Sequence, residues 1–216
     1  MQYLKDDVRD KIIKGALEEF LEKGFRDASM RGISRRSKLA IGSIYRYFAS
    51  KEAIFEYAIG PTYRQMRKTA DKLLRKIMES KITYKNFRSL ELINDLCNEQ
   101  LENFYEYSTE ILILIDKSQG TKYETYYQDA VSIVQKILIE VYLVELNKEG
   151  QKLPDESILA VIASSFTTGF YTILKSSSDI EQIKLLTHMF LIATFHDLTY
   201  SLTQAKNIEL FPHSMS

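Results

Sequence analysis

The chain has 216 residues and a formal net charge of zero at pH 7, and its 45% hydrophobic and 27% charged residues form an ordinary globular balance. Its single cysteine, Cys97, excludes an internal disulfide and indicates a reducing compartment. The first residues are charged rather than apolar, and the longest apolar runs are far shorter than the roughly 20 residues of a membrane span. We therefore expect a soluble, cytoplasmic protein without a membrane partner.

The low content of helix-breaking residues predicts the fold class. Three prolines and eight glycines in 216 residues favour long helices, and strict alternation of apolar and polar residues is nearly absent. The sequence therefore predicts an all-α protein. Its length suffices for a small domain and a larger one, which we expect to cover residues 1–59 and 60–216.

The first predicted helix, residues 8–23, is amphipathic. Ile12, Ala16 and Phe20 recur on one face at helical spacing, and Gly24 is placed to end the helix. This apolar stripe indicates core packing, so we expect the helix to be the wall on which the next helices pack.

Residues 28–51 have the pattern of a helix-turn-helix followed by a supporting helix. Ser29 is suited to cap a short helix over residues 30–36, and residues 37–39 are the turn. A second helix is predicted over residues 40–48, and Ser50 is suited to cap a third that begins at Lys51.

Positive charge is concentrated in the same segment. Residues 24–51 contain seven basic residues and one acidic residue, although the whole chain is neutral. Such segregation is the electrostatic footprint of contact with nucleic-acid phosphates. The alternative is a solvated basic face on an ordinary helical hairpin.

The second helix of a helix-turn-helix enters the DNA major groove, and its N-terminal residues reach the base edges. We therefore expect base contacts from Ala40, Ile41 and Ser43, with Gly42 letting the backbone approach closely. Basic and tyrosine side chains around them are expected to contact phosphates. The candidate DNA-binding residues are Ser29, Arg31, Arg35, Ala40, Ile41, Gly42, Ser43, Tyr45, Arg46, Tyr47 and Lys51.

This segment resembles the DNA-binding domain of the TetR family of transcriptional regulators. The resemblance covers residues 1–60 and rests on Phe20, Gly24-Phe25, Ser29, Ile33, Gly42-Ser43-Ile44-Tyr45, Tyr47-Phe48 and Lys51-Glu52. It implies an N-terminal three-helix DNA-binding domain followed by a C-terminal helical domain for ligand binding and dimerisation.

Two departures from the family pattern concern the reading of DNA. The family usually has Ala-Gly in the turn where this chain has Ser37-Lys38, so Lys38 would take left-handed backbone at a cost of about 1 kcal/mol. The family often opens its recognition helix with Ser or Thr and then Lys or Arg, where this chain has Ala40-Ile41. Either Arg46, Lys51 and the Arg35-Arg36 pair compensate, or the helix reads thymine methyl groups by apolar contact.

The remainder of the chain has a helical pattern throughout. Helices are predicted over residues 51–59, 63–81, 87–107, 109–117, 121–147, 155–175 and 179–203. Gly60-Pro61 is predicted to break the chain between helices, as an interdomain hinge or as a simple turn. The resemblance implies that the last two helices form a four-helix bundle with a second subunit; the alternative is that they only close the monomer core.

The family resemblance also implies an effector cavity lined by the middle helices. Aromatic residues that would fall in such a lining are Phe104, Tyr107, Tyr123, Tyr126, Tyr127, Phe166 and Phe170. They suit a small apolar or aromatic ligand that the sequence does not identify, or they simply fill the core.

No pattern for catalysis is present. The sequence has no Gly-rich phosphate loop, no Cys/His spacing for a metal and no nucleophile elbow, so we expect no enzyme activity, metal or cofactor. The first hypothesis is a homodimeric repressor that binds a palindromic operator in double-stranded DNA and is released by its effector. The alternative is an effector-independent architectural or nucleoid-associated DNA-binding protein.

Overall fold

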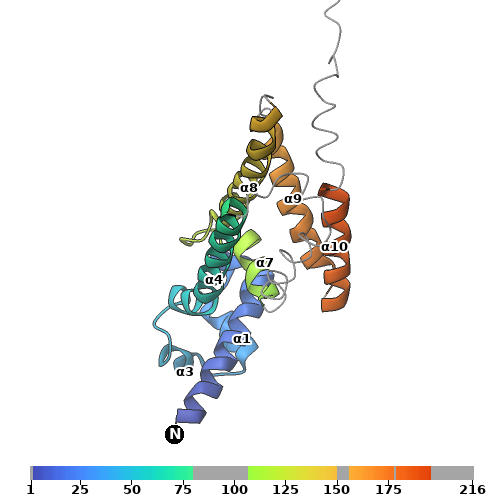
Figure 1. The fold of residues 1–216 in the computed structure, drawn as a ribbon. Coiled ribbons are helices and arrows are strands. Elements are labelled where there is room, and N and C mark those ends of the chain that lie inside the picture. The colour runs from blue at the N-terminus through green and yellow to red at the C-terminus, as the bar shows by residue number, and fades with distance from the viewer. Residues whose placement is uncertain (1, 80–106, 150–155, 178, 196–216) are drawn as a thin grey trace, which may run out of the picture. The chain divides into compact units, whose positions relative to one another are not determined.

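The computed structural model describes residues 2–79, 107–149, 156–177 and 179–195 (Figure 1). Within these ranges the regular elements are eight α-helices and no strand, which confirms the predicted all-α class. Cys97, Phe104 and most of the predicted helix 87–107 lie outside the described residues, as does the chain beyond Phe195.

The chain packs into two compact units. Unit 1 consists of residues 1–73 and 100–133, and unit 2 of residues 74–99 and 134–216. Each unit combines separate stretches of the chain, so these units are defined by packing in space and not by a single division of the sequence. The predicted division after residue 59 stays a prediction.

Helix α1 (Gln2–Asp27) supplies one wall of unit 1. Ile12, Ala16 and Phe20 are fully buried, as the apolar stripe predicts. Gly24 has non-helical backbone angles, φ 75° and ψ 162°, so the regular helix ends there as predicted. Left-handed φ values are accessible to glycine because it has no Cβ.

Two short helices follow α1. Helix α2 (Met30–Ser37) agrees with the predicted helix over residues 30–36. Helix α3 (Ile41–Tyr45) is shorter at both ends than the predicted helix over residues 40–48. Ala40 has extended backbone and no side chain that could cap the helix, and the last helical residue is Tyr45. Phe48, beyond the helix end, is still buried against the core.

Helix α4 (Lys51–Glu79) passes through Pro61 without ending, so the predicted break at Gly60-Pro61 is wrong. A proline in a helix interior costs about 3 kcal/mol through a lost hydrogen bond and a ring clash. The buried positions Phe55, Ile59, Thr62 and Met66 continue at helical spacing across the proline. Packing along this stripe therefore overrides the local preference to break.

Helices α7 (Ser108–Asp116) and α8 (Tyr126–Glu149) come later in the chain. Helix α7 packs on α1 within unit 1, and its Ile111, Ile113 and Leu114 are buried. The backbone N–H of Phe25 donates to the Lys117 carbonyl at 2.8 Å. The end of α1 is therefore joined to the segment that follows α7.

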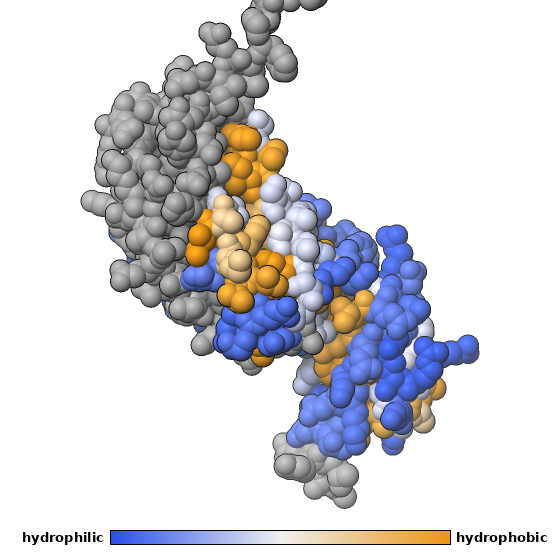
Figure 2. Space-filling model, turned by 90° about the vertical axis from the view of Figure 1, so that its right-hand side faces the viewer, coloured by the Kyte–Doolittle hydropathy of each residue, from blue (hydrophilic) through white to orange (hydrophobic). Residues whose placement is uncertain are grey.

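Helices α9 (Glu156–Ser176) and α10 (Ile180–Phe195) pack on each other in unit 2. Phe166 and Phe190 stack with their ring centroids 5.6 Å apart, and Phe190 lies directly over Gly169. Figure 2 shows apolar side chains gathered on the face of the molecule where α10 lies. Within the described residues, one helix segment, Ser157–Ser176, is long and apolar enough by composition to cross a membrane.

Candidate nucleic-acid interface

The start of α2 is fixed by Ser29, as predicted. The Ser29 hydroxyl oxygen accepts a hydrogen bond from the Gly32 N–H at 3.0 Å, which satisfies one of the unpaired donors of the helix N-terminus. The Ser29 N–H donates to Glu19 at 3.4 Å. Ser29 therefore orients α2 on α1, and its contact with DNA stays a prediction.

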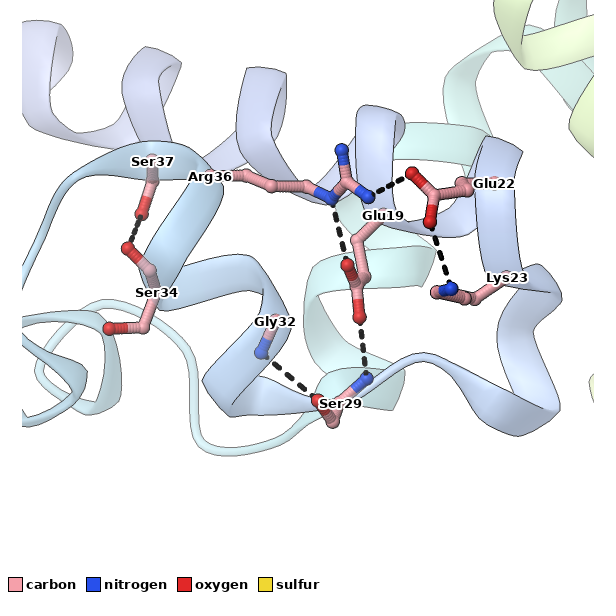
Figure 3. A network of polar contacts seen from close by, with 8 residues as sticks. All are labelled: Glu19, Glu22, Lys23, Ser29, Gly32, Ser34, Arg36 and Ser37. Atoms are coloured by element: carbon pink, nitrogen blue, oxygen red, sulfur yellow. Dashed lines mark hydrogen bonds and ion pairs between the residues drawn. The ribbon is translucent and has the colours of Figure 1, made fainter.

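A buried ion pair ties the end of α2 to α1 (Figure 3). The Glu19 side chain is only 4% exposed and accepts from Arg36 Nε at 2.8 Å. Arg36 also bonds to Glu22, which Lys23 contacts at 2.8 Å. These bonds raise the pKa of Arg36, chiefly through Glu19, and the bonds from Lys23 and Arg36 lower the pKa of Glu22 to about 2.

The turn between α2 and α3 takes the backbone conformation that the sequence predicted. Lys38 has φ 57° and ψ 30°, which is left-handed and costs a non-glycine residue about 1 kcal/mol. The Ser34 hydroxyl donates to the Leu39 carbonyl at 2.6 Å, and the Leu39 N–H donates to the Ser34 carbonyl at 3.2 Å. These bonds set the direction in which α3 leaves the turn.

Helix α3 has an inner and an outer side. Ile44 on the inner side is fully buried. On the outer side, Ile41 is 38% exposed, Tyr45 is 50% exposed, and a Cβ added at Gly42 would meet no atom within 4 Å. Ala40, just before the helix, is also exposed. The outer side is therefore an unobstructed surface whose first residues carry only hydrocarbon.

Two predicted contacts lie beside this surface. Arg46 is exposed and donates to the Ser43 hydroxyl oxygen at 3.1 Å, so these two candidate residues are in contact with each other. Tyr47 is half-buried after the helix end. The structure therefore places Ala40, Ile41, Gly42, Ser43, Tyr45, Arg46 and Tyr47 in one continuous stretch of unit 1.

Lys51 differs from the other basic candidates because its ammonium group is bound inside the domain. Its Nζ donates to the carbonyls of Phe25 at 2.6 Å and Ala28 at 2.9 Å, and to that of Arg26 at 3.3 Å. It also lies 4.4 Å from the centroid of the Phe25 ring. Its phosphate contact stays a prediction, but these bonds favour a structural role in which α4 is joined to the end of α1.

Besides Arg46, four basic side chains of the segment are exposed. Arg26, Arg31, Arg35 and Lys38 have no side-chain partner among the residues that the structure describes. A guanidinium or ammonium group without an intramolecular acceptor is available to a phosphate oxygen. Of these four, Arg31 and Arg35 are predicted DNA contacts.

The predicted effector-lining residues fall in both units. In unit 1, Tyr123 and Tyr126 are buried, with their ring centroids 4.8 and 6.0 Å from that of Tyr63. The Tyr123 hydroxyl donates to Glu56 at 2.7 Å. Burial and this bond raise the pKa of Tyr123, and burial raises that of Tyr126. These two tyrosines belong to the core that surrounds α4.

The other described candidates are half-buried. Tyr107 precedes α7 and Tyr127 lies in the first turn of α8, both in unit 1, whereas Phe166 and Phe170 lie on α9 in unit 2. Phe104 lies outside the described residues. Their assignment to one cavity stays a prediction.

Glu19 is a structural residue that was not predicted from the sequence. It lies between the buried positions Ala16 and Phe20 at helical spacing, so an acidic residue on an apolar stripe was the available signal. Its partner Arg36 is 17 positions away, and no local pattern identifies a pair at that separation.

Helix α3 is exposed, has basic residues near it in the sequence, and follows the two supporting helices α1 and α2. This arrangement is that of a helix-turn-helix DNA-binding domain. Comparison with known proteins agrees with this class. The family profile described as bacterial regulatory proteins, tetR family, matches residues 12–58. Residues 12–58 therefore match the DNA-binding domain of the tetR family, as the sequence resemblance predicted.

Individual relatives share the same part of the chain. The uncharacterised HTH-type transcriptional regulator YdgC of Bacillus subtilis (strain 168) is 38% identical over 66 residues, which are 31% of this chain and 34% of that protein. The HTH-type transcriptional regulator UidR of Escherichia coli (strain K12) is 37% identical over 59 residues, 27% of this chain and 30% of that protein. The chain thus matches about a third of the length of these relatives.

A solved structure extends the likeness in fold. A candidate regulator of fatty acid metabolism from Clostridium perfringens superposes with a TM-score of 0.52, covering 86% of this chain and 96% of that one. The two sequences are 17% identical, so the match concerns the fold alone. It supports the helical architecture beyond the matched N-terminal residues.

Proposed function

We propose that this protein is a cytoplasmic transcriptional regulator without enzyme activity, which binds operator DNA as a homodimer and acts as a repressor. The observation that carries the proposal is the outer side of α3, which is unobstructed at Gly42 and exposed at Ile41 and Tyr45 within the tetR-family domain. Exposed Arg31 and Arg35 on α2 supply the positive charge that a DNA backbone requires.

The homodimer is supported by the apolar surface of the last two helices. Large side chains on this surface are between 40% and 59% exposed, which is unusual for a solvated face: Ile158, Val161, Ile180, Leu185 and Met189. A twofold dimer through this face would present two recognition helices about 34–36 Å apart to a palindromic operator. One helix-turn-helix alone contacts too few base pairs for high specificity.

The dimer is tested by charging its proposed interface. The double variant Leu185→Glu and Met189→Glu places two carboxylates on the exposed face of α10, and we expect light scattering to give the mass of a monomer. Glu181→Ala, at an exposed position of the same helix, is the control and should stay dimeric. A monomeric mass for the unmodified protein would contradict the proposed dimer. So would recovery of the protein only with detergent, since α9 is long and apolar enough by composition to cross a membrane.

The release of DNA by a small apolar or aromatic effector is the second element of the proposal. It is supported by half-buried tyrosines of the middle segment, Tyr107 directly before α7 and Tyr127 in the first turn of α8. A ligand at 100 times its dissociation constant stabilises the folded state by about 2.7 kcal/mol, so a thermal-shift screen should reveal it. A screen without any stabilising ligand would favour an effector-independent architectural protein.

The DNA-binding function is tested by selecting a randomised duplex pool on the purified protein at two salt concentrations. We expect recovery of a palindrome and an affinity that falls steeply with salt, because phosphate contacts release counterions. Salt-dependent binding without a motif would favour the architectural protein. Absence of binding at both salt concentrations, with and without the stabilising ligand, would contradict the proposed function.

A further inference from the structure

We propose that Ile41 is the principal specificity-determining residue of α3 and that it recognises the 5-methyl group of thymine in each operator half-site. The inference rests on the proposed DNA-binding function and concerns the chemistry by which that site distinguishes bases. It rests on three observations: the position of Ile41, the hydrocarbon side chains of its neighbours, and the hydrogen bond that the Ser43 hydroxyl oxygen accepts from Arg46.

Ile41 is the first residue of α3 and is 38% exposed, although isoleucine is among the residues most often buried. Its exposure is not a local packing failure, because Ile44 in the same helix is fully buried. The helix is therefore anchored by one apolar side chain and displays another. Since recognition helices contact bases through their N-terminal residues, the displayed one lies where base edges are read.

The residues beside Ile41 bring no competing polar side chain to the start of the helix. Ala40 and Gly42 carry a methyl group and a hydrogen atom, and both positions are exposed. The Ser43 hydroxyl oxygen accepts a hydrogen bond from Arg46 at 3.1 Å, so it is directed toward its own helix. The first two positions that can approach a base therefore present only hydrocarbon side chains.

The major groove contains one hydrocarbon group, the thymine 5-methyl; its other readable groups are hydrogen-bond donors and acceptors. An isoleucine placed on a guanine, adenine or cytosine edge would remove water from a polar group without replacing the hydrogen bond, which is unfavourable. Placed on a thymine methyl, it removes apolar surface of both partners from water, which is favourable. The same side chain thus selects thymine and opposes the other bases.

Close approach is needed for this contact, and Gly42 permits it. A Cβ at Gly42 would find open space in the free protein, so the missing side chain is not required by the fold of the described residues. The exposed Arg31 and Arg35 on α2 supply charge complementarity to the DNA backbone beside the apolar contact. The occupant of this apolar surface is therefore a DNA groove rather than a second protein.

The experiment uses the selected operator and replaces each thymine in turn by deoxyuridine, which lacks only the 5-methyl group. For the unmodified protein we expect a loss of roughly fourfold in affinity per contacted methyl, the equivalent of one buried methyl group. In Ile41→Ala the same replacement should have no effect. Leu21→Ala is the matched control, because Leu21 is also 38% exposed but lies on α1, and it should keep the full sensitivity.

The outcomes separate this inference from the proposed function. Specific binding that no deoxyuridine replacement weakens would overturn the thymine contact. So would a loss of affinity on deoxyuridine replacement that is as large in Ile41→Ala as in the unmodified protein. Neither result would contradict the proposed function as a DNA-binding regulator. A selected motif without thymine in the half-site would likewise overturn only the thymine contact. Failure of the unmodified protein to bind any duplex would overturn both. Circular dichroism and thermal unfolding of Ile41→Ala, expected to match the unmodified protein, ensure that a lost contact is not a lost fold.

Discussion

Arg35 and Arg36 are neighbours in α2, but they have opposite environments. Arg35 is exposed and has no side-chain partner in the described part of the chain, whereas Arg36 binds the buried Glu19 and also Glu22. Lys38 and Lys51 form a similar pair, since Lys38 is exposed and Lys51 donates to three carbonyls. Local positive charge therefore marks the segment, but tertiary partners decide which cations are available to DNA.

Gly32 and Gly42 show the same contrast between an internal contact and an open surface. A Cβ at Gly32 would overlap the Glu19 carboxylate, whereas one at Gly42 would meet nothing within 4 Å. The first glycine is required by the inner contact between α1 and α2. The second is available for close approach from outside, so the two sides of the motif can be separated by mutation.

The largest expected effect comes from Arg36→Ala. It would leave the Glu19 carboxylate buried without its cation, and removal of one partner of a buried pair costs about 3 kcal/mol or more of unfolding free energy. Urea unfolding measures the change. Arg35→Ala is the control and should change the unfolding free energy by less than about 0.5 kcal/mol.

The same pair should reverse its order in DNA binding. Arg35→Ala should reduce the dependence of the logarithm of affinity on the logarithm of salt by about 0.9 per lost phosphate contact. Equal destabilisation by both variants, or an unchanged salt dependence in Arg35→Ala, would break the distinction between inner and outer arginines.

Lys51→Met should lower the unfolding free energy by about 2 kcal/mol. The methionine keeps the apolar stem but removes the charged hydrogen bonds to the Phe25 and Ala28 carbonyls and the contact with the Phe25 ring. Thermal unfolding measures this loss. The salt dependence of DNA binding should stay unchanged, and a decrease similar to that of Arg35→Ala would instead place Lys51 on a phosphate.

Gly32→Ala should lower the unfolding free energy by about 1–2 kcal/mol. The added methyl group displaces the Glu19 carboxylate, whose end is flexible but is held by Arg36, so part of the overpacking strain relaxes. Gly42→Ala should be neutral or slightly stabilising in the same unfolding assay, because alanine favours a helix and the site is open. It should nevertheless weaken operator binding, and preserved affinity would contradict close approach at α3.

The smallest expected effect is the acid dependence contributed by Glu22. Its pKa is lowered to about 2 by Lys23 and Arg36, so its ionised form is favoured in the folded state. The resulting stability is present above the ordinary glutamate pKa of 4.5 and is lost as the pH falls toward 2. Glu22→Gln should reduce the pH dependence of the thermal unfolding midpoint between those pH values. The change should be small, because this carboxylate is solvent-exposed and its charge is screened. Identical profiles of the two proteins would show that the bonds do not persist in solution.

The features that were predicted correctly from the sequence are those whose determining contacts are local. The Ser29 cap, the end of regular helix at Gly24 and the left-handed Lys38 each depend on residues within a few positions, and all three were confirmed. The break predicted at Gly60-Pro61 was wrong because proline's local preference was outweighed by buried positions on both sides of it. Propensity is a weak term when a long apolar stripe opposes it.

By itself, the sequence determined the all-α class, the helix-turn-helix and its basic segment, because helical periodicity, capping and charge density are properties of short stretches. Only the tertiary structure decided which of those basic residues bond to groups within the protein. Arg36 meets Glu19 across 17 positions and Lys51 meets Phe25 across 26, and pairs at such separations are set by how whole helices pack. The exposure of Ile41 was decided in the same way, since the buried Ile44 determines which side of α3 faces outward.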